Sequence, residues 1–287
     1  MAELIYVSSR KVLLDALESL GGERSAVILV GAQAVHLRVG DSGTAVVSRT
    51  TDADLSLNPQ LLTGRPDLAS AMRAANLRLR TDRNGHEEPG IWISPPLPGA
   101  PSGVTVDLLV ADALSAEKGK RAAVLTGQDA RAARYVYGIE AALYDNGPLV
   151  VAALDNTDPR SFEIAVAGPA ALLIAKLVKL TERLSSGRLD PKDAFEIYRL
   201  LQGDVQAIAQ GWIQAEAEEL SKPVAAVAEG ALRELFAADG SRGAEIAGDF
   251  ARGRDDPVTV SQSSRALAQE LLATLAKVRS QAYPSRA

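Results

Sequence analysis

The residues best suited to chemistry lie in residues 49–57, where Asp52 and Asp54 stand two positions apart. Side chains two positions apart on a β-strand project from the same face. A strand here would therefore place both carboxylates on one face and pack Ala53, Leu55 and Leu57 on the other. Mg²⁺ is commonly held by one or two carboxylates together with substrate phosphates. Taken alone, the motif favours a solvated strand end, with a metal site as the alternative; the surrounding motifs favour the metal site.

A third carboxylate, Asp107, falls inside the apolar strand pattern of residues 104–110. A buried carboxylate costs several kcal/mol unless it is paired or bound to a cation. A structural salt bridge and a bound metal explain Asp107 equally well when this strand is considered by itself.

A candidate phosphate-binding turn begins at Gly31, which follows the apolar run of residues 26–30 and precedes a helical pattern through Val39. The first amides of a helix lack partners within the helix, and the helix dipole adds positive charge there. Such a corner can hold a phosphate. A tight strand–helix turn without a ligand is the structural alternative.

Lys176 lies among apolar residues in a predicted helix over residues 170–183. A lysine in that setting either extends its amine to solvent or meets an anion. The next helix has a clear start, because Asp190 is a favourable N-cap and Pro191 suits the first helical position. That helix runs to about residue 201 and carries Asp193 and Glu196.

Five arginines are candidates for contacts with an RNA backbone, with solvated helix ends as the alternative. They are Arg73, Arg78, Arg80, Arg131 and Arg134. Arg131 and Arg134 are three positions apart, so they would share a face if that stretch were helical.

The elements that must position these residues change character along the chain. The sequence predicts helices over residues 10–20, capped by Ser8 or Ser9, and from residue 66 or 67 through Leu77. Further strands are predicted over residues 91–94, 140–154 (one or two strands, with a turn at 145–148) and 162–166. From residue 205 onward the pattern is helical, with breaks near Pro223, Gly240 and Pro257. We therefore expect an α+β fold, with an α/β domain over 1–167 and a helical domain over 168–287 that contributes to an active-site cleft.

The composition excludes several classes of site. The 287 residues include no cysteine and two histidines, which excludes disulfides and thiolate metal sites and disfavours a histidine-rich zinc site. The formal net charge of −5 argues against a general nucleic-acid coat. No signal peptide and no apolar run of about 18 residues is evident, so we expect a cytoplasmic protein without a membrane span.

The order of these motifs resembles the polymerase-β-like nucleotidyltransferases. Residues 175–177 (Ala-Lys-Leu) and residues 191–198 (Pro-Lys-Asp-Ala-Phe-Glu-Ile-Tyr) are similar to the narrower AbiEii/MenT group, the toxin halves of toxin–antitoxin and phage-defence pairs. The resemblance covers about residues 25–201. It implies a nucleotidyltransferase domain with a short mixed sheet flanked by helices, followed by a helical C-terminal domain.

The resemblance also implies roles for individual residues. Asp52 and Asp54 match the metal-binding pair, and Asp107 matches the third acid that helps to activate the attacking hydroxyl. Lys176 matches a lysine that contacts the nucleotide phosphates, and Asp193 matches the later acid of the active site. The nucleotide-binding set comprises Gly31, Ala32, Gln33, Thr51 and Lys176. Two departures are Ala32, where the family usually has glycine or serine, and Glu196, where many relatives have aspartate.

The activity implied is Mg²⁺-dependent transfer of NMP from an NTP to an RNA acceptor, with the 3′ end of tRNA as the expected target and a cognate antitoxin as a possible partner. Two alternatives stay open. One is a nucleotidyltransferase that modifies a small molecule or a protein. The other is a non-catalytic binding module with the same fold.

Overall fold

The computed structural model describes residues 2–40, 52–116, 119 and 121–282. The chain divides into two compact units. The first, here called the sheet unit, comprises Met1–Ala34, Val47–Tyr137 and Asn146–Ala167. The second, the helical unit, comprises Val35–Val46, Gly138–Asp145 and Gly168–Ala287. Ala167 ends the last segment of the sheet unit, and two short segments of the helical unit precede it in the chain.

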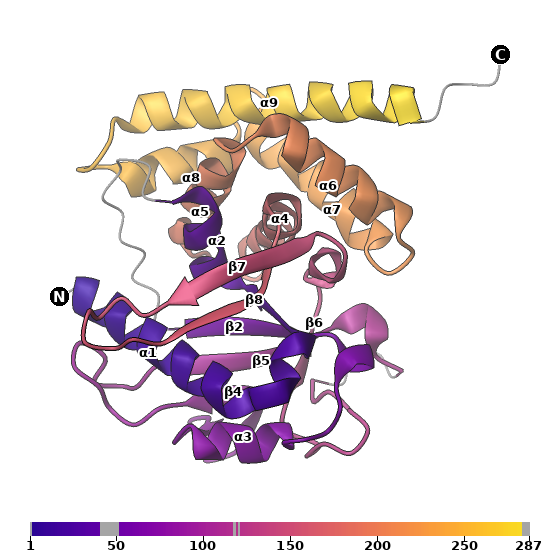
Figure 1. Ribbon diagram of the computed structural model, residues 1–287. Coiled ribbons are helices and arrows are strands. Elements are labelled where there is room, and N and C mark those ends of the chain that lie inside the picture. The colour runs from indigo at the N-terminus through magenta and orange to yellow at the C-terminus, as the bar shows by residue number, and fades with distance from the viewer. Residues whose placement is uncertain (1, 41–51, 117–118, 120, 283–287) are drawn as a thin grey trace. The chain divides into compact units, whose positions relative to one another are not determined.

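The sheet unit is built on a mixed sheet of eight described strands (Figure 1). Its strands are β1 (Val27–Val30), β2 (Asp52–Leu57), β3 (Arg78–Thr81), β4 (Glu87–Ile93), β5 (Thr105–Ala111), β6 (Arg134–Val136), β7 (Asn146–Ala152) and β8 (Ser161–Ala167). The order is β3-β4-β5-β2-β1-β8-β7, and β6 also pairs with β5. Pairs β2–β5, β1–β8 and β5–β6 are parallel, and the others are antiparallel.

Helix α1 (Ala2–Leu20) covers one face of this sheet, where it contacts β2, β5 and β8. It also contacts α3 (Leu68–Ala74). The side chains of Ala53, Leu55 and Leu57 on β2 are fully buried, as expected for the apolar side of an alternating strand. The polar side chains of β2 consequently lie on the opposite face of the sheet. The remaining helical segments are η1 (Gly21–Ala26), η2 (Pro59–Leu61), η3 (Asp112–Leu114) and the start of α2 (Gly31–Val39).

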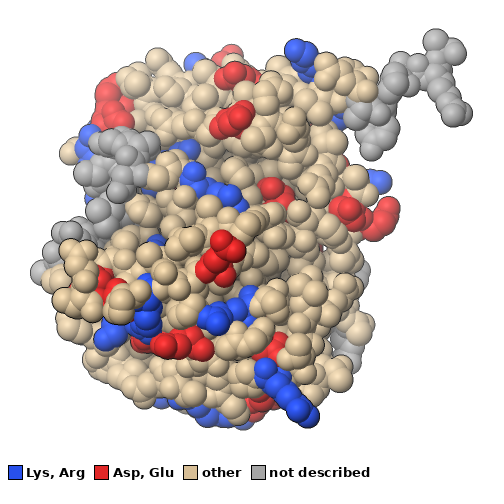
Figure 2. All heavy atoms as spheres, viewed as in Figure 1, with Lys and Arg blue, Asp and Glu red and all other residues tan. Residues whose placement is uncertain are grey.

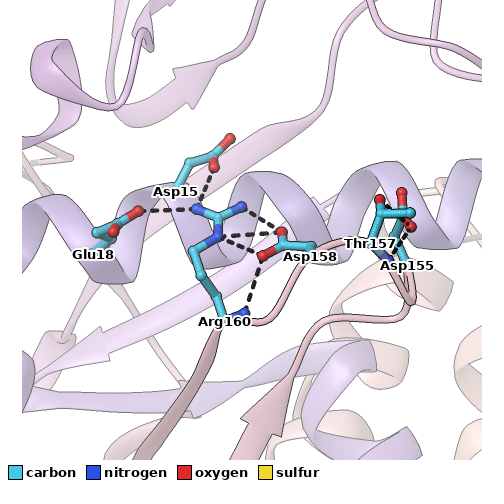
Figure 3. A network of polar contacts seen from close by, with 6 residues as sticks. All are labelled: Asp15, Glu18, Asp155, Thr157, Asp158 and Arg160. Carbon is cyan, nitrogen blue, oxygen red and sulfur yellow. Dashed lines mark hydrogen bonds and ion pairs between the residues drawn. The ribbon is translucent and has the colours of Figure 1, made fainter.

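A charged network ties the β7–β8 hairpin to α1 (Figure 3). Arg160, which directly precedes β8, donates to Asp15 at 2.7 Å and to Glu18 at 3.0 Å, both on α1. It also forms an ion pair with Asp158 in the hairpin loop at 2.7 Å. One guanidinium thus joins three carboxylates from two segments, which fixes the hairpin against the helix that covers the sheet.

The helical unit packs around α4 (Pro169–Ser185), which contacts α5 (Pro191–Leu201), α6 (Val205–Ala217) and α7 (Lys222–Leu232). A π-helical turn, η5 (Arg233–Ala237), continues α7, and α8 (Arg242–Ala251) and α9 (Pro257–Ala282) follow it. Phe195, Trp212 and Phe236 are among its largest buried side chains. The short η4 (Glu140–Leu143) also belongs to this unit. None of the described helices combines the length and apolar character needed to cross a bilayer.

Several sequence-based boundaries agree with the structure. Asp67 caps α3 and Asp190 caps α5, in each case through a side-chain oxygen that accepts an amide of the first turn. Gly31 begins α2 directly after β1. These starts were predictable because capping and glycine conformations are local properties.

Three sequence-based expectations are wrong. The first helix begins at Ala2, not after Ser8 or Ser9, because Tyr6 extends the buried side of α1 by a turn. Residues 140–143 form a 3₁₀ turn, and residues 146–148 open β7 where a turn between strands was expected. Pro148 is tolerated there because β7 is the edge strand, where a missing amide costs no ladder bond. The Arg131–Arg134 stretch is not helical, since Arg134 opens β6.

Candidate active site

Asp54 and Asp107 lie directly opposite each other on the parallel strands β2 and β5. In-register residues of neighbouring strands project to the same face, so both carboxylates point away from the face that α1 covers. Asp52 stands two residues before Asp54 and shares that face, opposite Thr105. Asp107, which is distant in sequence from Asp52 and Asp54, thus lies on the same face of the sheet as they do.

Gly31 lies against Asp54. β1 pairs with β2 so that Val30 is opposite Asp54, and Gly31 follows with a φ of +71°. A Cβ atom at Gly31 would lie 2.0 Å from Oδ2 of Asp54. Glycine is therefore required here both by the backbone conformation and by the space that the carboxylate fills. The candidate phosphate turn and a candidate metal ligand form one local structure.

Asp107 is 8% exposed and forms a salt bridge with Arg134, whose Nη2 lies 2.6 Å from Oδ2. Burial raises the pKa of Asp107; the charge of Arg134 opposes that rise, and the charge of Asp52 adds to it. The second carboxylate oxygen, Oδ1, is buried and has no hydrogen-bond partner within the described chain. Of the two explanations open for Asp107, the structure therefore contains the salt bridge, and Oδ1 remains without a partner among the described residues.

The donor set fits a hard divalent cation. All three side chains offer carboxylate oxygens, which Mg²⁺ prefers, and Oδ1 of Asp107 is a buried acceptor without a partner among the described residues. Within that part of the chain, no three Asp, Glu or His side chains already stand together as a metal-binding group. The sheet supplies the register of the ligands, while the Asp107 carboxylate is engaged by Arg134.

The nucleotide-binding prediction places Gln33 beside a ligand, but its side chain is bound by other residues of the protein. Its side chain is 1% exposed, and its Oε1 accepts from Nε of Arg10 at 2.9 Å. Its side-chain nitrogen Nε2 lies 3.5 Å from the carbonyl oxygen of Asp52. The side chain of Gln33 therefore braces the start of β2, and only its backbone amide remains a candidate for phosphate binding. Ala32 is also buried, and Thr51 lies outside the described residues.

In the helical unit, Lys176 is 6% exposed and its Nζ contacts carboxylates of Asp193, at 3.0 Å, and Glu196. Burial favours the neutral amine, yet Glu196 and Asp193 outweigh it and raise the pKa of Lys176. Burial of Asp193 is likewise outweighed, by Lys176 above all, so its pKa is lowered. The expectation that Lys176 meets an anion is confirmed, and the anions it meets are two carboxylates one turn apart on α5.

Asp145 is a polar residue of the helical unit that sequence reasoning missed. Its Oδ2 accepts the amide of Ala171 at 2.8 Å in the first turn of α4. Gly168 and Gly211 leave room for its carboxylate, because a Cβ at Gly168 would lie 2.0 Å from Oδ1 and one at Gly211 3.1 Å from Cγ. Burial raises the pKa of Asp145, with the Ala171 amide and Arg38 acting in the opposite direction. In the sequence, Gly168 and Gly211 carry no sign that they lie against Asp145, so its surroundings could not be predicted.

No family model, curated protein or solved structure matches this chain.

The arginines considered for RNA binding are mostly engaged by carboxylates. Arg73 lies 3.9 Å from Asp129 and stacks over Trp92, while Arg80 pairs with Glu88. Arg131 pairs with Glu87 and Arg134 with Asp107. On the face seen in Figure 2, the described basic and acidic side chains are interspersed and form no continuous basic area. A phosphate backbone would have to compete with these carboxylates for the guanidinium groups.

Proposed function

We propose that this chain is a Mg²⁺-dependent nucleotidyltransferase with a polymerase-β-like nucleotidyltransferase fold. One observation supports it most: Gly31, at the start of α2, is packed against Asp54, which itself lies opposite Asp107. A helix start that can hold phosphate and a set of carboxylates that can hold Mg²⁺ are thus adjacent in one sheet. That is the combination that transfer from a nucleoside triphosphate requires.

Asp52, Asp54 and Asp107 are the residues that would hold the metal. Bound Mg²⁺ would offset charge on the triphosphate and make the acceptor hydroxyl more acidic. The hydroxyl oxygen of the acceptor forms a bond to the α-phosphorus, the bond to the bridging oxygen breaks, and pyrophosphate leaves. Asp107 is the residue proposed to take the hydroxyl proton, because its strand places it opposite Asp54 on the same face of the sheet.

The first amides of α2, from Gly31 to Gln33, are the proposed phosphate donors in the sheet unit. The resemblance assigns Lys176 to the triphosphate as well. Since Lys176 already binds Asp193 and Glu196, a nucleotide contact requires that one of these carboxylates release it. Asp193 then acts as a positioning residue for Lys176.

The acceptor is proposed to be RNA, with the 3′ end of tRNA as the first candidate and with a toxin role in a toxin–antitoxin or phage-defence pair. The ion-paired state of Arg73, Arg80 and Arg131 favours one alternative, a small-molecule acceptor that needs no basic surface. RNA binding by these arginines would weaken steeply as salt is raised, whereas transfer to an uncharged small molecule would not.

The test is label transfer from each of the four α-labelled NTPs to total tRNA in the presence of Mg²⁺. Asp52→Asn and Asp54→Asn should each abolish transfer while circular dichroism and the urea midpoint show a folded protein. Glu163→Gln, an exposed carboxylate on β8 of the same sheet, is the matched control and should retain wild-type transfer. Transfer that survives both aspartate variants contradicts the proposal. Label on an added small molecule but not on tRNA would select the alternative acceptor.

A further inference from the structure

Arg134 occupies a point where β5 changes its partner strand. Residues 105–107 of β5 pair with β4, and residues 109–111 pair with β6, which begins at Arg134. Gly90 on β4 makes this change possible. It has a φ of +71°, and a Cβ there would lie 2.6 Å from the amide nitrogen of Arg134. Arg134 is in register with Leu109, which shares a face with Asp107, so the guanidinium is built onto the same face as the carboxylates.

The contact that Arg134 makes uses only part of its hydrogen-bonding capacity. Nη2 donates to Oδ2 of Asp107 at 2.6 Å. Nε of Arg134 and Oδ1 of Asp107 are both buried without a hydrogen-bond partner in the described chain. An arginine that serves only as a structural partner of a carboxylate commonly forms two parallel hydrogen bonds. Here one donor and one acceptor of the pair remain without a partner in the described chain, each of the kind that a second ligand would use.

Oδ1 of Asp107 and the guanidinium of Arg134 would bind ligands of opposite charge. Oδ1 of Asp107 can accept a cation on the face that also carries Asp54 and Asp52. The guanidinium of Arg134 has the planar fork that fits a phosphate, and its side chain is 20% exposed. Mg²⁺ bound to a nucleotide supplies both charges at once.

We propose that Arg134 is a resident counter-ion of the carboxylate set, which releases Asp107 when a divalent cation binds and then binds a phosphate of the nucleotide. This inference rests on the proposed function. It adds a residue that the resemblance does not assign to the site and gives it a positioning role: Arg134 neutralises Asp107 in the metal-free protein and orients the nucleotide in the loaded one. The metal and the arginine compete for Asp107, whereas the nucleotide and the metal cooperate.

The test compares Arg134→Gln with Arg121→Gln. Arg121 is a matched control in the same unit, because it is 60% exposed and lies 3.9 Å from a carboxylate, that of Glu88, to which it is only weakly paired. Two affinities are measured for each protein: Mn²⁺ alone, by electron paramagnetic resonance, and an α,β-methylene NTP in the presence of Ca²⁺, by calorimetry, with each base in turn.

For Arg134→Gln we expect changes of opposite sign. Mn²⁺ should bind tighter by roughly twofold to fivefold, the range for a partly exposed ion pair, because its competitor for Asp107 is gone. The NTP analogue should bind more weakly by roughly tenfold, because a charge-assisted contact to phosphate is lost. Arg121→Gln should change neither affinity by more than about twofold.

A purely structural role for Arg134 would weaken both affinities together or change neither, and either result overturns the inference. If Arg134→Gln does not fold, Arg134→Lys provides the test: it keeps the positive charge but lacks the fork, so Mn²⁺ affinity should stay near that of the wild type while NTP affinity falls. Equal losses of both affinities in Arg134→Lys would also overturn it. Failure of wild-type protein to bind Mn²⁺ or any NTP analogue would instead contradict the proposed function itself.

Discussion

The two units each contain a cluster of buried charge, and the clusters differ in balance. In the helical unit, Lys176 lies between Asp193 and Glu196, and Arg183 also binds Asp193. Here the pKa of the carboxyl group is lowered and that of the amine is raised. In the sheet unit, carboxylates crowd one face and the pKa of Asp107 is raised, above all by burial.

The charged cluster of the helical unit therefore stabilises its unit, whereas keeping the carboxylates of the sheet unit on one face costs free energy. Opposite charges with several contacts offset the desolvation of Lys176 and Asp193. Asp107 has one hydrogen bond from Arg134 and a neighbouring negative charge, and burial raises its pKa above the ordinary value. Carboxyl groups whose pKa is shifted in this way are found at sites that bind a cation or transfer a proton.

Removing the cation of the balanced cluster should have the largest effect. Lys176→Met leaves two buried carboxylates without their central partner, and breaking a buried pair in this way costs about 3–5 kcal/mol. We expect the free energy of unfolding in urea to fall by this amount. Lys192→Met is the control, since Lys192 lies 3.6 Å from Glu196 at the margin of the cluster and leaves Lys176 in place. Equal losses in the two variants would show that Lys176 has no special place in the cluster.

In the sheet unit, Gly31→Ala should have the next largest effect. The positive φ alone costs about 1–3 kcal/mol for a residue with a side chain, and the new Cβ must displace the carboxylate of Asp54. We therefore expect both a lower unfolding free energy and a loss of NTP-dependent labelling. Gly22→Ala is a matched control, because a Cβ at Gly22 meets nothing within 4 Å, so its stability should stay within about 0.5 kcal/mol of wild type.

The pH dependence of stability should distinguish a carboxylate with a lowered pKa from one with a raised pKa. For Asp193, whose folded-state pKa is lowered, the stabilisation relative to Asp193→Asn is complete above the unfolded pKa of about 3.9 and is lost as pH falls through the folded pKa. For Asp145, whose folded-state pKa is raised by burial, the difference from Asp145→Asn should instead decrease as pH rises above about 4. Urea titrations of both pairs over acidic pH measure the two slopes, and slopes of the same sign would contradict the assignment.

The parts of the fold that were predictable from sequence are those set by local patterns. Alternation around Asp52 and Asp54 gave the correct strand and the correct face, and Asp190-Pro191 gave the start of α5. These features depend on a period of two or on capping, both of which are encoded within a few residues.

The partners of the charged residues were not predictable, because they come from distant segments. Nothing near Asp107 in sequence indicates Arg134, which is placed beside it by a change of strand partner at Gly90. Arg10 is a charged residue on the apolar side of α1, and its bond to Gln33 depends on how α1 packs. The strand that carries Arg134 was also not predictable, because β6 has three residues and its pairing with β5 is tertiary.

The exposed ion pairs of the sheet unit give the smallest expected effect and concern the acceptor. Arg131 is 55% exposed and pairs with Glu87, which is 42% exposed. If Arg131 contacts RNA phosphates, then Glu87 competes with the RNA, so Glu87→Gln should strengthen tRNA binding at low salt by roughly twofold to fivefold. Because the contribution is electrostatic, the gain should shrink as salt is raised. Gel-shift titrations at two ionic strengths measure it, with Glu163→Gln as the control for the loss of one negative charge. An equal gain in both variants would mean that only net charge matters, and no gain in either would remove Arg131 from the proposed RNA contacts.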